Sequence, residues 1–350
     1  MAGKKAVVFL TVLFLIGAGL ALTPAVTNAG SSKILRVAYP SADRGFAPDM
    51  IKWWGEHVEK ATNGAVKVQF YWGGILGTSK EMLYSIEKGM CDVGVIFPMY
   101  FSTELPLATV NTCMISTSKN DPFLTSRAWT QLAEEFPQIP AEWEAHNQKL
   151  LMGWEVGPYM WVSKKPIKTF DDLKGLKVGI WGGKGPRQLA VEMGSIPRSI
   201  ASVEVYDALD KATIDARAES LPMVITYKHY EICDYITDVG VGTIGAPVYA
   251  MSINNKTWNS LSKEAQSQIL QVTEAWWGYY EKRITEAQSN DKASLEEKGM
   301  KFLEFSRADK EKVRALPVYK TFRQTYIERA EDANLAAKIF DRYRELLEQQ

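Results

Sequence analysis

The side chains that could carry out catalysis are few and widely separated. His57, His146 and His229 lie far apart in the sequence, and none belongs to a His-x-x-x-His or His-Glu-x-x-His unit, so we expect no metal site. The glycine-rich segment that begins at Gly179 differs from a phosphate-binding loop, because Gly185 follows Lys184 where Ser or Thr is required. There is no Gly-x-Ser-x-Gly motif either. The inventory predicts no catalytic residues and no cofactor.

Composition and charge exclude several classes of partner. Of the 350 residues, 46% are hydrophobic and 23% are charged, which is typical of a globular protein. Lys and Arg number 41, as do Asp and Glu, so a nucleic-acid partner or a polybasic membrane contact is not expected. The balance includes Lys4 and Lys5 near the N-terminus. Without residues 1–30, 39 basic residues stand against 41 acidic ones, a net charge of −2.

The N-terminal segment predicts export. Lys4 and Lys5 precede an apolar run over residues 6–22, and small residues follow up to Ala29. This order is that of a secretory signal peptide, and we expect cleavage after Ala29. The alternative is an uncleaved membrane anchor, although the apolar run is shorter than the roughly 20 residues that span a membrane. We therefore expect a periplasmic chain that is secreted through the inner membrane and is not itself inserted in it.

The cysteine content is too low for a disulfide scaffold. Only Cys91, Cys113 and Cys233 occur. Either Cys91 and Cys113 form one bridge or the cysteines are buried free thiols, and one cysteine is unpaired in both cases.

The pattern of apolar residues predicts two α/β regions followed by helices. Residues 34–97 alternate between strands and helices, which favours a sheet covered by helices. We expect helix at 46–61, 82–88, 170–173, 186–193 and 202–209, and strand at 34–39, 66–70, 92–97, 150–154, 159–162, 176–180, 213–215, 235–237 and 248–253.

The last hundred residues are predicted to be helical. A nearly unbroken helix is expected from Trp258 to about Lys298, and a terminal amphipathic helix from Asp332 to Leu347. At 1.5 Å per residue the first would reach roughly 60 Å. Such a helix either bends or spans two lobes.

Seven short segments, in their order and spacing, resemble the DctP-type solute-binding proteins of TRAP (tripartite ATP-independent periplasmic) transporters. The resemblance runs from about Ile34 to the C-terminus. The segments are 62–68 (TNGAVKV), 74–77 (GILG), 87–92 (EKGMCD), 165–169 (KPIKT), 171–178 (DDLKGLKV), 203–209 (VEVYDAL) and 214–216 (IDA).

The resemblance implies a two-lobed periplasmic binding protein of the α/β class, type II-like, with a long lobe-spanning helix and a helical C-terminus. We assign residues 30–156 and 245–284 to lobe I, and residues 157–244 and 285–350 to lobe II. Closure of the lobes on a small organic solute, by default an organic acid, would stabilise the closed state. The resemblance implies that the partners are the small and large membrane subunits of a TRAP permease. It also implies that the chain is not an enzyme.

The expected ligand site departs from the family pattern. Family members usually hold a ligand carboxylate with an arginine, because guanidinium and carboxylate match bidentately. Here the corresponding positions are Gly179 and Tyr159, and Glu219 stands at or beside a usual asparagine. The predicted ligand-binding residues are Pro40, Phe97, Tyr100, Tyr159, Gly179, Trp181, Arg187 and Glu219.

This set favours an aromatic or otherwise atypical solute, either a flat and less polar molecule or a cation held over the ring faces. If the solute is an anion, Arg187 is the best replacement for the missing arginines. Arg44, Arg198 and Arg217 are weaker candidates. Alternatives remain, since aromatic residues on strands often belong to a core, as expected for Trp161. A periplasmic ligand sensor on the same scaffold is a second functional reading, and an exported enzyme is a third.

Overall fold

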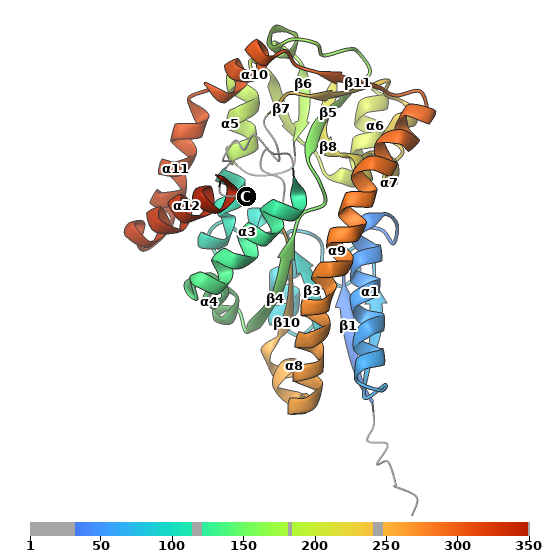
Figure 1. Ribbon diagram of the computed structural model, residues 1–350, viewed down its shortest axis with the longest axis vertical. Coiled ribbons are helices and arrows are strands. Elements are labelled where there is room, and N and C mark those ends of the chain that lie inside the picture. Colours follow the sequence, from blue (N-terminus) through green and yellow to red (C-terminus); the bar gives the residue numbers. More distant parts are fainter. Residues whose placement is uncertain (1–31, 114–120, 181–183, 241–247, 349–350) are drawn as a thin grey trace, which may run out of the picture. The chain divides into compact units, whose positions relative to one another are not determined.

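The computed structural model describes residues 32–113, 121–180, 184–240 and 248–348. The predicted signal peptide and its cleavage point lie outside the described residues. Residues 32–350 form one compact unit, which contains two mixed sheets with helices packed on them (Figure 1). None of the described helices is long and apolar enough to cross a membrane.

The first sheet contains the N-terminal strands. Strand β1 runs parallel to β2 and β3, and β10 joins β3 and β4 in antiparallel pairs. The order across the sheet is β2 (Val66–Tyr71), β1 (Lys33–Ala38), β3 (Val93–Ile96), β10 (Tyr249–Asn254) and β4 (Gln148–Trp154). Because β1 and β3 are parallel, the loops that follow them leave the same edge of the sheet.

The second sheet is built from later segments. Strand β6 runs parallel to β7 and β8, whereas β5 is antiparallel to β8 and β9. The order is β11 (Lys301–Glu304), β9 (Tyr235–Asp238), β5 (Tyr159–Ser163), β8 (Ala216–Ser220), β6 (Lys177–Ile180) and β7 (Ile196–Ser199). The chain crosses between the sheets from β4 to β5, from β9 to β10, and again after β10.

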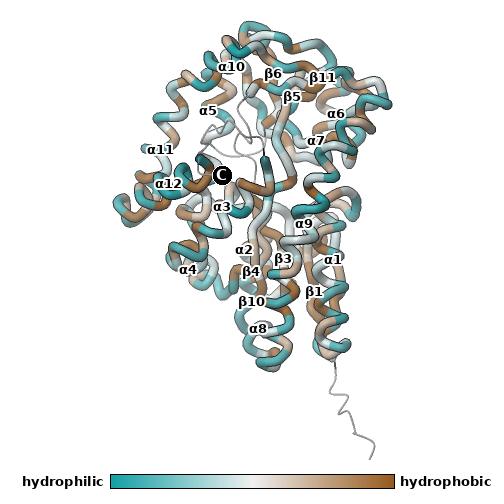
Figure 2. The backbone as a smooth tube through the Cα atoms, in the orientation of Figure 1, coloured by the Kyte–Doolittle hydropathy of each residue, from teal (hydrophilic) through white to brown (hydrophobic). Residues whose placement is uncertain are grey.

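The helices cover these sheets and form the C-terminal part. They are α1 (Phe46–Ala61), α2 (Met82–Glu87), α3 (Pro122–Glu135), α4 (Gln138–Ala145), α5 (Lys184–Glu192), α6 (Val205–Asp210), α7 (Leu221–Thr226), α8 (Asn255–Ser260), α9 (Lys263–Glu297), α10 (Arg307–Arg314), α11 (Val318–Arg329) and α12 (Ala333–Glu348). Short 3-10 turns are η1 (Pro98–Tyr100), η2 (Leu107–Cys113), η3 (Phe170–Leu173), η4 (Ser202–Glu204) and η5 (His229–Glu231). Helices α1 and α9 alternate hydrophilic and hydrophobic residues in Figure 2, as expected for helices with one buried face.

The long helix predicted from Trp258 is interrupted. Helix α8 ends at Ser260, and Ser262 caps α9 by accepting a hydrogen bond from the Ala265 amide at 3.1 Å. Serine satisfies an otherwise unpaired amide at a helix start, so this residue begins a new helix. Helix α9 has 35 residues, about 52 Å at 1.5 Å per residue. It packs against α1 and β4 of the first sheet and against α7, which follows β8 of the second (Figure 1).

The predicted strand at residues 213–215 is wrong. Thr213 and Ile214 donate backbone hydrogen bonds to the Ala208 carbonyl and close the end of α6, and the strand begins at Ala216. Strand β8 carries Arg217 and Glu219 although four of its five residues are buried. A buried strand with two charged residues lacks the apolar pattern on which strand prediction depends.

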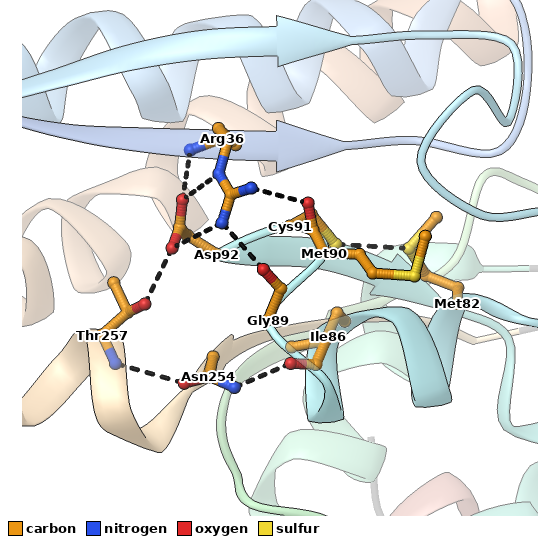
Figure 3. Close-up of polar contacts among 9 residues, drawn as sticks. All are labelled: Arg36, Met82, Ile86, Gly89, Met90, Cys91, Asp92, Asn254 and Thr257. Atoms are coloured by element: carbon orange, nitrogen blue, oxygen red, sulfur yellow. Dashed lines mark hydrogen bonds and ion pairs between the residues drawn. The ribbon is translucent and has the colours of Figure 1, made fainter.

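A polar cluster fixes the turn after α2 to the first sheet (Figure 3). The Arg36 guanidinium donates from Nε to Asp92 Oδ2 at 2.8 Å and from its two terminal nitrogens to the carbonyls of Met90 and Gly89 at 2.9 Å. Burial pushes the pKa of Asp92 upward, but the bonds from Arg36 and Thr257 outweigh it, so this pKa lies below its usual value. The motif at residues 87–92 therefore has a structural role. Its bonds with Arg36 connect the end of α2 to β1 and β3, and we call this polar cluster the joint.

The same cluster extends to α8. Thr257 donates its hydroxyl to Asp92 Oδ1 at 2.8 Å, and Asn254 donates its amide to the Ile86 carbonyl at 2.7 Å (Figure 3). The side-chain oxygen of Asn254 accepts from the Thr257 amide at 3.2 Å and caps α8. These bonds tie together β3, β10 and the end of α2.

Cys91 and Cys233 are free thiols rather than halves of a bridge. Cys91 and Cys233 are buried and free, and burial raises the pKa of each thiol to about 12. The alternative of a Cys91–Cys113 disulfide is therefore not realised.

The C-terminal helices pack on elements of the first region, and one of them also contacts the second. Helix α12 packs on α3 and η2, and α11 contacts both η2 and α5. Tyr326 of α11 donates its hydroxyl to the Leu107 carbonyl at 2.9 Å. This contact fixes the helix face that carries Phe322, Thr325 and Arg329.

Candidate functional site

A cavity of about 370 Å³ lies where loops of the first sheet face strands of the second. Such crevices outside the carboxyl ends of strands are the usual binding places of α/β sheets. Its described lining residues are Pro40, Ser41, Gly73, Gly74, Thr78, Ser79, Lys80, Phe97, Met99, Tyr100, Tyr159, Ala201, Ser202, Val203, Arg217, Glu219, Met223 and Tyr249.

One arginine reaches this cavity from a position that sequence reasoning ranked low. Arg217 on β8 is the register partner of Gly179 on β6. A Cβ atom at Gly179 would lie 3.1 Å from Cδ of Arg217 and 2.7 Å from Cδ1 of Ile214. The side chain of Arg217 therefore passes through space that a larger residue at 179 would need.

The guanidinium of Arg217 is held in a buried ion pair. Its Nε donates to Glu219 Oε1 at 2.9 Å, and Nη1 donates to the Ile200 carbonyl at 3.2 Å. Arg217 is 1% exposed and Glu219 is 0% exposed. Burial raises the pKa of Glu219, and the positive charge and hydrogen bond of Arg217 oppose that shift. The second carboxylate oxygen of Glu219 has no hydrogen-bond partner, so the floor of the cavity retains an unsatisfied acceptor.

Aromatic rings form much of the remaining wall. Phe97 and Tyr249 meet edge to face with centroids 4.7 Å apart, and Phe97 and Tyr100 at 6.2 Å. Tyr159 is buried, and burial raises its hydroxyl pKa well above the usual value. The raised pKa keeps Tyr159 neutral at physiological pH, and the ring faces surround the Arg217–Glu219 pair.

A second, larger cavity adjoins the first. It measures about 620 Å³ and shares Lys80, Met99 and Tyr100 with the smaller one. Its other described lining residues are Ser102, Thr103, Thr109, Thr112, Lys184, Gly185, Pro186, Arg187, Ser199, Phe322, Thr325 and Arg329.

The predicted site residues divide between these places. Five of them line the smaller cavity, namely Pro40, Phe97, Tyr100, Tyr159 and Glu219. Arg187 lines the larger one and does not line the smaller. Gly179 lines neither cavity, and the side chain of Arg217 packs beside it. Trp181 lies outside the described residues, and Trp161 is buried in a core cluster. That the eight predicted site residues bind the solute stays a prediction.

Sequence reasoning underrated Arg217 and did not consider Tyr249, Lys184, Lys80 or Arg329. The available signal for Arg217 was its spacing of two from Glu219, which puts both side chains on one face of a strand. That signal was lost because the strand was expected three residues earlier.

His229 lines neither of the two cavities. Burial, assisted by the charge of Arg217, lowers the pKa of His229 to about 3, so its buried imidazole is neutral. Within the described residues, no three His, Cys, Asp or Glu side chains gather as a metal site would require.

Comparison with known proteins identifies the family. The family model described as bacterial extracellular solute-binding protein, family 7 (DctP), matches residues 48–325. A 2,3-diketo-L-gulonate-binding periplasmic protein of Escherichia coli (strain K12) is 24% identical over 287 residues, which cover 79% of this chain and 83% of that protein.

Solved structures share the fold. An extracytoplasmic solute receptor of Bordetella pertussis that binds pyroglutamic acid superposes with a TM-score of 0.79 and 17% identity, over 89% of this chain and 100% of that one. A TRAP periplasmic solute-binding protein of Desulfovibrio salexigens with bound orotic acid gives 0.75 and 20%, over 91% and 99%. The family match and this fold confirm the resemblance in the sequence: the chain belongs to the DctP family of extracellular solute-binding proteins, with the two-sheet fold of TRAP solute receptors.

Proposed function

We propose that this chain is a periplasmic receptor that binds a small organic acid between its two sheets and delivers it to the small and large membrane subunits of a TRAP permease. The family supplies the solute-binding role. Relatives and structural neighbours named for 2,3-diketo-L-gulonate, pyroglutamic acid and orotic acid support an acidic solute. The N-terminal basic and apolar pattern supports export with cleavage after Ala29.

The observation that best supports an acidic solute is the position of Arg217 beside Gly179. The family usually has an arginine where Gly179 stands, and here the neighbouring strand sends Arg217 through the same space. The acidic group of the solute pairs with this guanidinium in a charge-assisted hydrogen bond. A hydrogen-bond donor of the solute satisfies the unpartnered oxygen of Glu219.

The wall of the smaller cavity favours a planar group in the part of the solute that binds there. Phe97, Tyr100, Tyr159 and Tyr249 give the ring surfaces, which stack on planar groups. The two sheets belong to two lobes, and the solute stabilises their closed arrangement because it contacts both.

A thermal-shift screen of the full chain tests this proposal. The panel contains aromatic and aliphatic carboxylates, sulfonates, amines and polyols, and a bound solute raises the melting temperature with the logarithm of its concentration. Arg217→Gln alone would strand the buried charge of Glu219. The informative variant is therefore Arg217→Gln combined with Glu219→Gln, measured against its own ligand-free melting temperature.

We expect a planar carboxylate to give the largest shift and the double variant to lose it. Arg198→Gln is the matched control, because Arg198 is an exposed arginine on β7 that lines neither cavity. A double variant that retained the full shift would contradict the proposal, as would a panel in which amines or polyols gave the largest shifts.

A further inference from the structure

The larger cavity gathers positive charge from three separate segments. Lys80 precedes α2, Lys184 and Arg187 lie in the first turn of α5, and Arg329 is the last residue of α11. No Asp or Glu is among the described residues that line this cavity. Like charges that converge without a carboxylate repel one another, and an anion relieves that repulsion.

These four side chains have no anionic partner elsewhere in the described part of the chain. By contrast, neighbouring arginines of the C-terminal helices are paired, Arg323 with Asp341 at 2.8 Å and Arg342 with Glu135 at 2.7 Å. Arg329 therefore differs from the paired arginines of the C-terminal helices, and Lys80, Lys184 and Arg187 share its lack of a carboxylate partner among the described residues.

The cavity wall also contains hydroxyl groups that can donate hydrogen bonds, and the backbone at Gly185 packs closely on neighbouring elements. Ser102, Ser199 and Thr325 bring hydroxyl groups to it. A Cβ at Gly185 would lie 3.1 Å from the Thr112 carbonyl oxygen and 3.1 Å from the Phe322 ring, so the start of α5 packs tightly on η2 and α11. The positive end of the α5 dipole lies in this first turn and favours a negative group there.

We propose that the larger cavity binds a second oxyanion group of the same solute, so that the preferred solute is an extended dianion. This inference rests on the proposed function, because it takes the first acidic group to be held at Arg217. Lys80, Met99 and Tyr100 line both cavities, so one solute can reach from one to the other. The second group is a carboxylate, sulfonate or phosphate, since each presents the same charged oxygens to the four cations.

The two cavities would contribute differently to affinity. In the smaller cavity Glu219 already neutralises Arg217, so the charge of Arg217 contributes less to the affinity for an anion. In the larger cavity the four cations have no such partner among the described residues. Their attraction for an anion depends on salt, because Lys80, Lys184 and Arg187 are exposed and Arg329 is only partly buried. A second oxyanion should therefore increase affinity at low salt more than at high salt.

The test has two arms, both on the full chain. In the first arm, inorganic phosphate is titrated at constant ionic strength, and saturable stabilisation is expected. The combined variant Arg187→Gln and Arg329→Gln should lose that stabilisation, whereas Arg198→Gln should retain it. Equal stabilisation by phosphate in all three proteins, or none in the wild type beyond that of chloride, would overturn the anion site.

In the second arm, calorimetry compares benzoate with terephthalate and 4-sulfobenzoate, which share a ring and differ in the para group. We expect at least a tenfold gain from either para anion, abolished by Arg187→Gln with Arg329→Gln while benzoate affinity is unchanged. Phosphate binding without such a gain would overturn the claim that one solute spans both cavities. If the Arg217 and Glu219 double variant kept its affinity for benzoate while phosphate behaved as expected, the proposed function would fail and the anion site would stand.

Discussion

At the scale of single residues, Gly179 and Arg217 act as a pair across two adjacent strands. The Cα atoms are register partners, and the side chain of Arg217 fills the space beside Gly179. The long side chain on β8 therefore fits only because the residue beside it on β6 is a glycine. Its consequence is that a guanidinium remains at the cavity although position 179 cannot provide it.

Gly179→Ala should disturb this pair. The added methyl group would meet Ile214 at 2.7 Å and Arg217 at 3.1 Å, and overpacking of this kind costs about 1–3 kcal/mol. We expect a lower urea midpoint and weaker solute binding. Gly278→Ala is the control, because a Cβ there meets nothing within 4 Å and alanine favours helix. If both variants behaved alike, Arg217 would not depend on the space at Gly179.

At the scale of elements, the joint of Figure 3 shows what a family motif does physically. Asp92 lies at the start of β3 and receives bonds from Arg36 of β1 and Thr257 of α8. Because the joint holds the end of α2, it also fixes the loop at Thr78, Ser79 and Lys80 that lines the cavities.

Asp92→Asn should destabilise this joint. The substitution removes a charge-assisted bond to Arg36, and hydrogen bonds to charged groups contribute about 1.5–3 kcal/mol. Urea denaturation should show a lower midpoint. Since the pKa of Asp92 is lowered, its contribution is present near neutral pH and is lost as the pH falls below about 4. The exposed Asp234→Asn is the control; an equal effect of the two substitutions at pH 7 would contradict the role of the joint.

The elements that the sequence predicted well are those whose own residues determine them. The helix expected at 46–61 is found as α1 with the same ends, because its apolar stripe is regular and the Asn63-Gly64 turn follows it. The short helix expected at 170–173 is found at the same residues as the 3-10 turn η3. Strand β8 was misplaced and the break at Ser262 was missed, since the first is decided by partners on other strands and the second by one capping serine.

The candidate site was predictable only in part for the same reason. Loop and strand-end residues such as Pro40 and Phe97 were found from the family order. That Arg217 lies beside Gly179 follows from the pairing of β6 with β8, which one sequence does not reveal. The convergence of Lys80, Arg187 and Arg329 likewise depends on how α11 packs between η2 and α5.

At the scale of the whole molecule, the crossing from β4 to β5 contains a buried carboxyl group. Glu155 accepts a hydrogen bond from Thr125 at 2.8 Å, and its backbone carbonyl accepts one from Tyr280 of α9 at 2.7 Å. Burial raises the pKa of Glu155 to about 8, so the folded chain holds it protonated at neutral pH. This crossing joins the two sheets to the long helix that lies along both.

Glu155 should therefore make the fold less stable as the pH rises from about 4.5 to about 8. Glu155 ionises in the unfolded chain near pH 4.5 and in the folded chain near pH 8, so between these values the folded state binds more protons. One such group lowers the unfolding free energy by at most about 1.4 kcal/mol per pH unit. Glu155→Gln should reduce the decline in urea midpoint between pH 5.5 and 7.5, and the exposed Glu56→Gln should leave it unchanged. A Glu155→Gln profile identical to that of the wild type would show that this carboxyl is ionised in the fold.

The central claim is that an acidic solute binds between the two sheets at Arg217. A crystal structure of the full chain with the solute that gives the largest thermal shift tests it most directly. The account predicts that an acidic group of the solute lies within about 2.7–3.2 Å of the Arg217 guanidinium, beside Gly179. A solute bound outside this cavity, or one whose acidic group contacts other residues while Arg217 stays bound to Glu219, would contradict it.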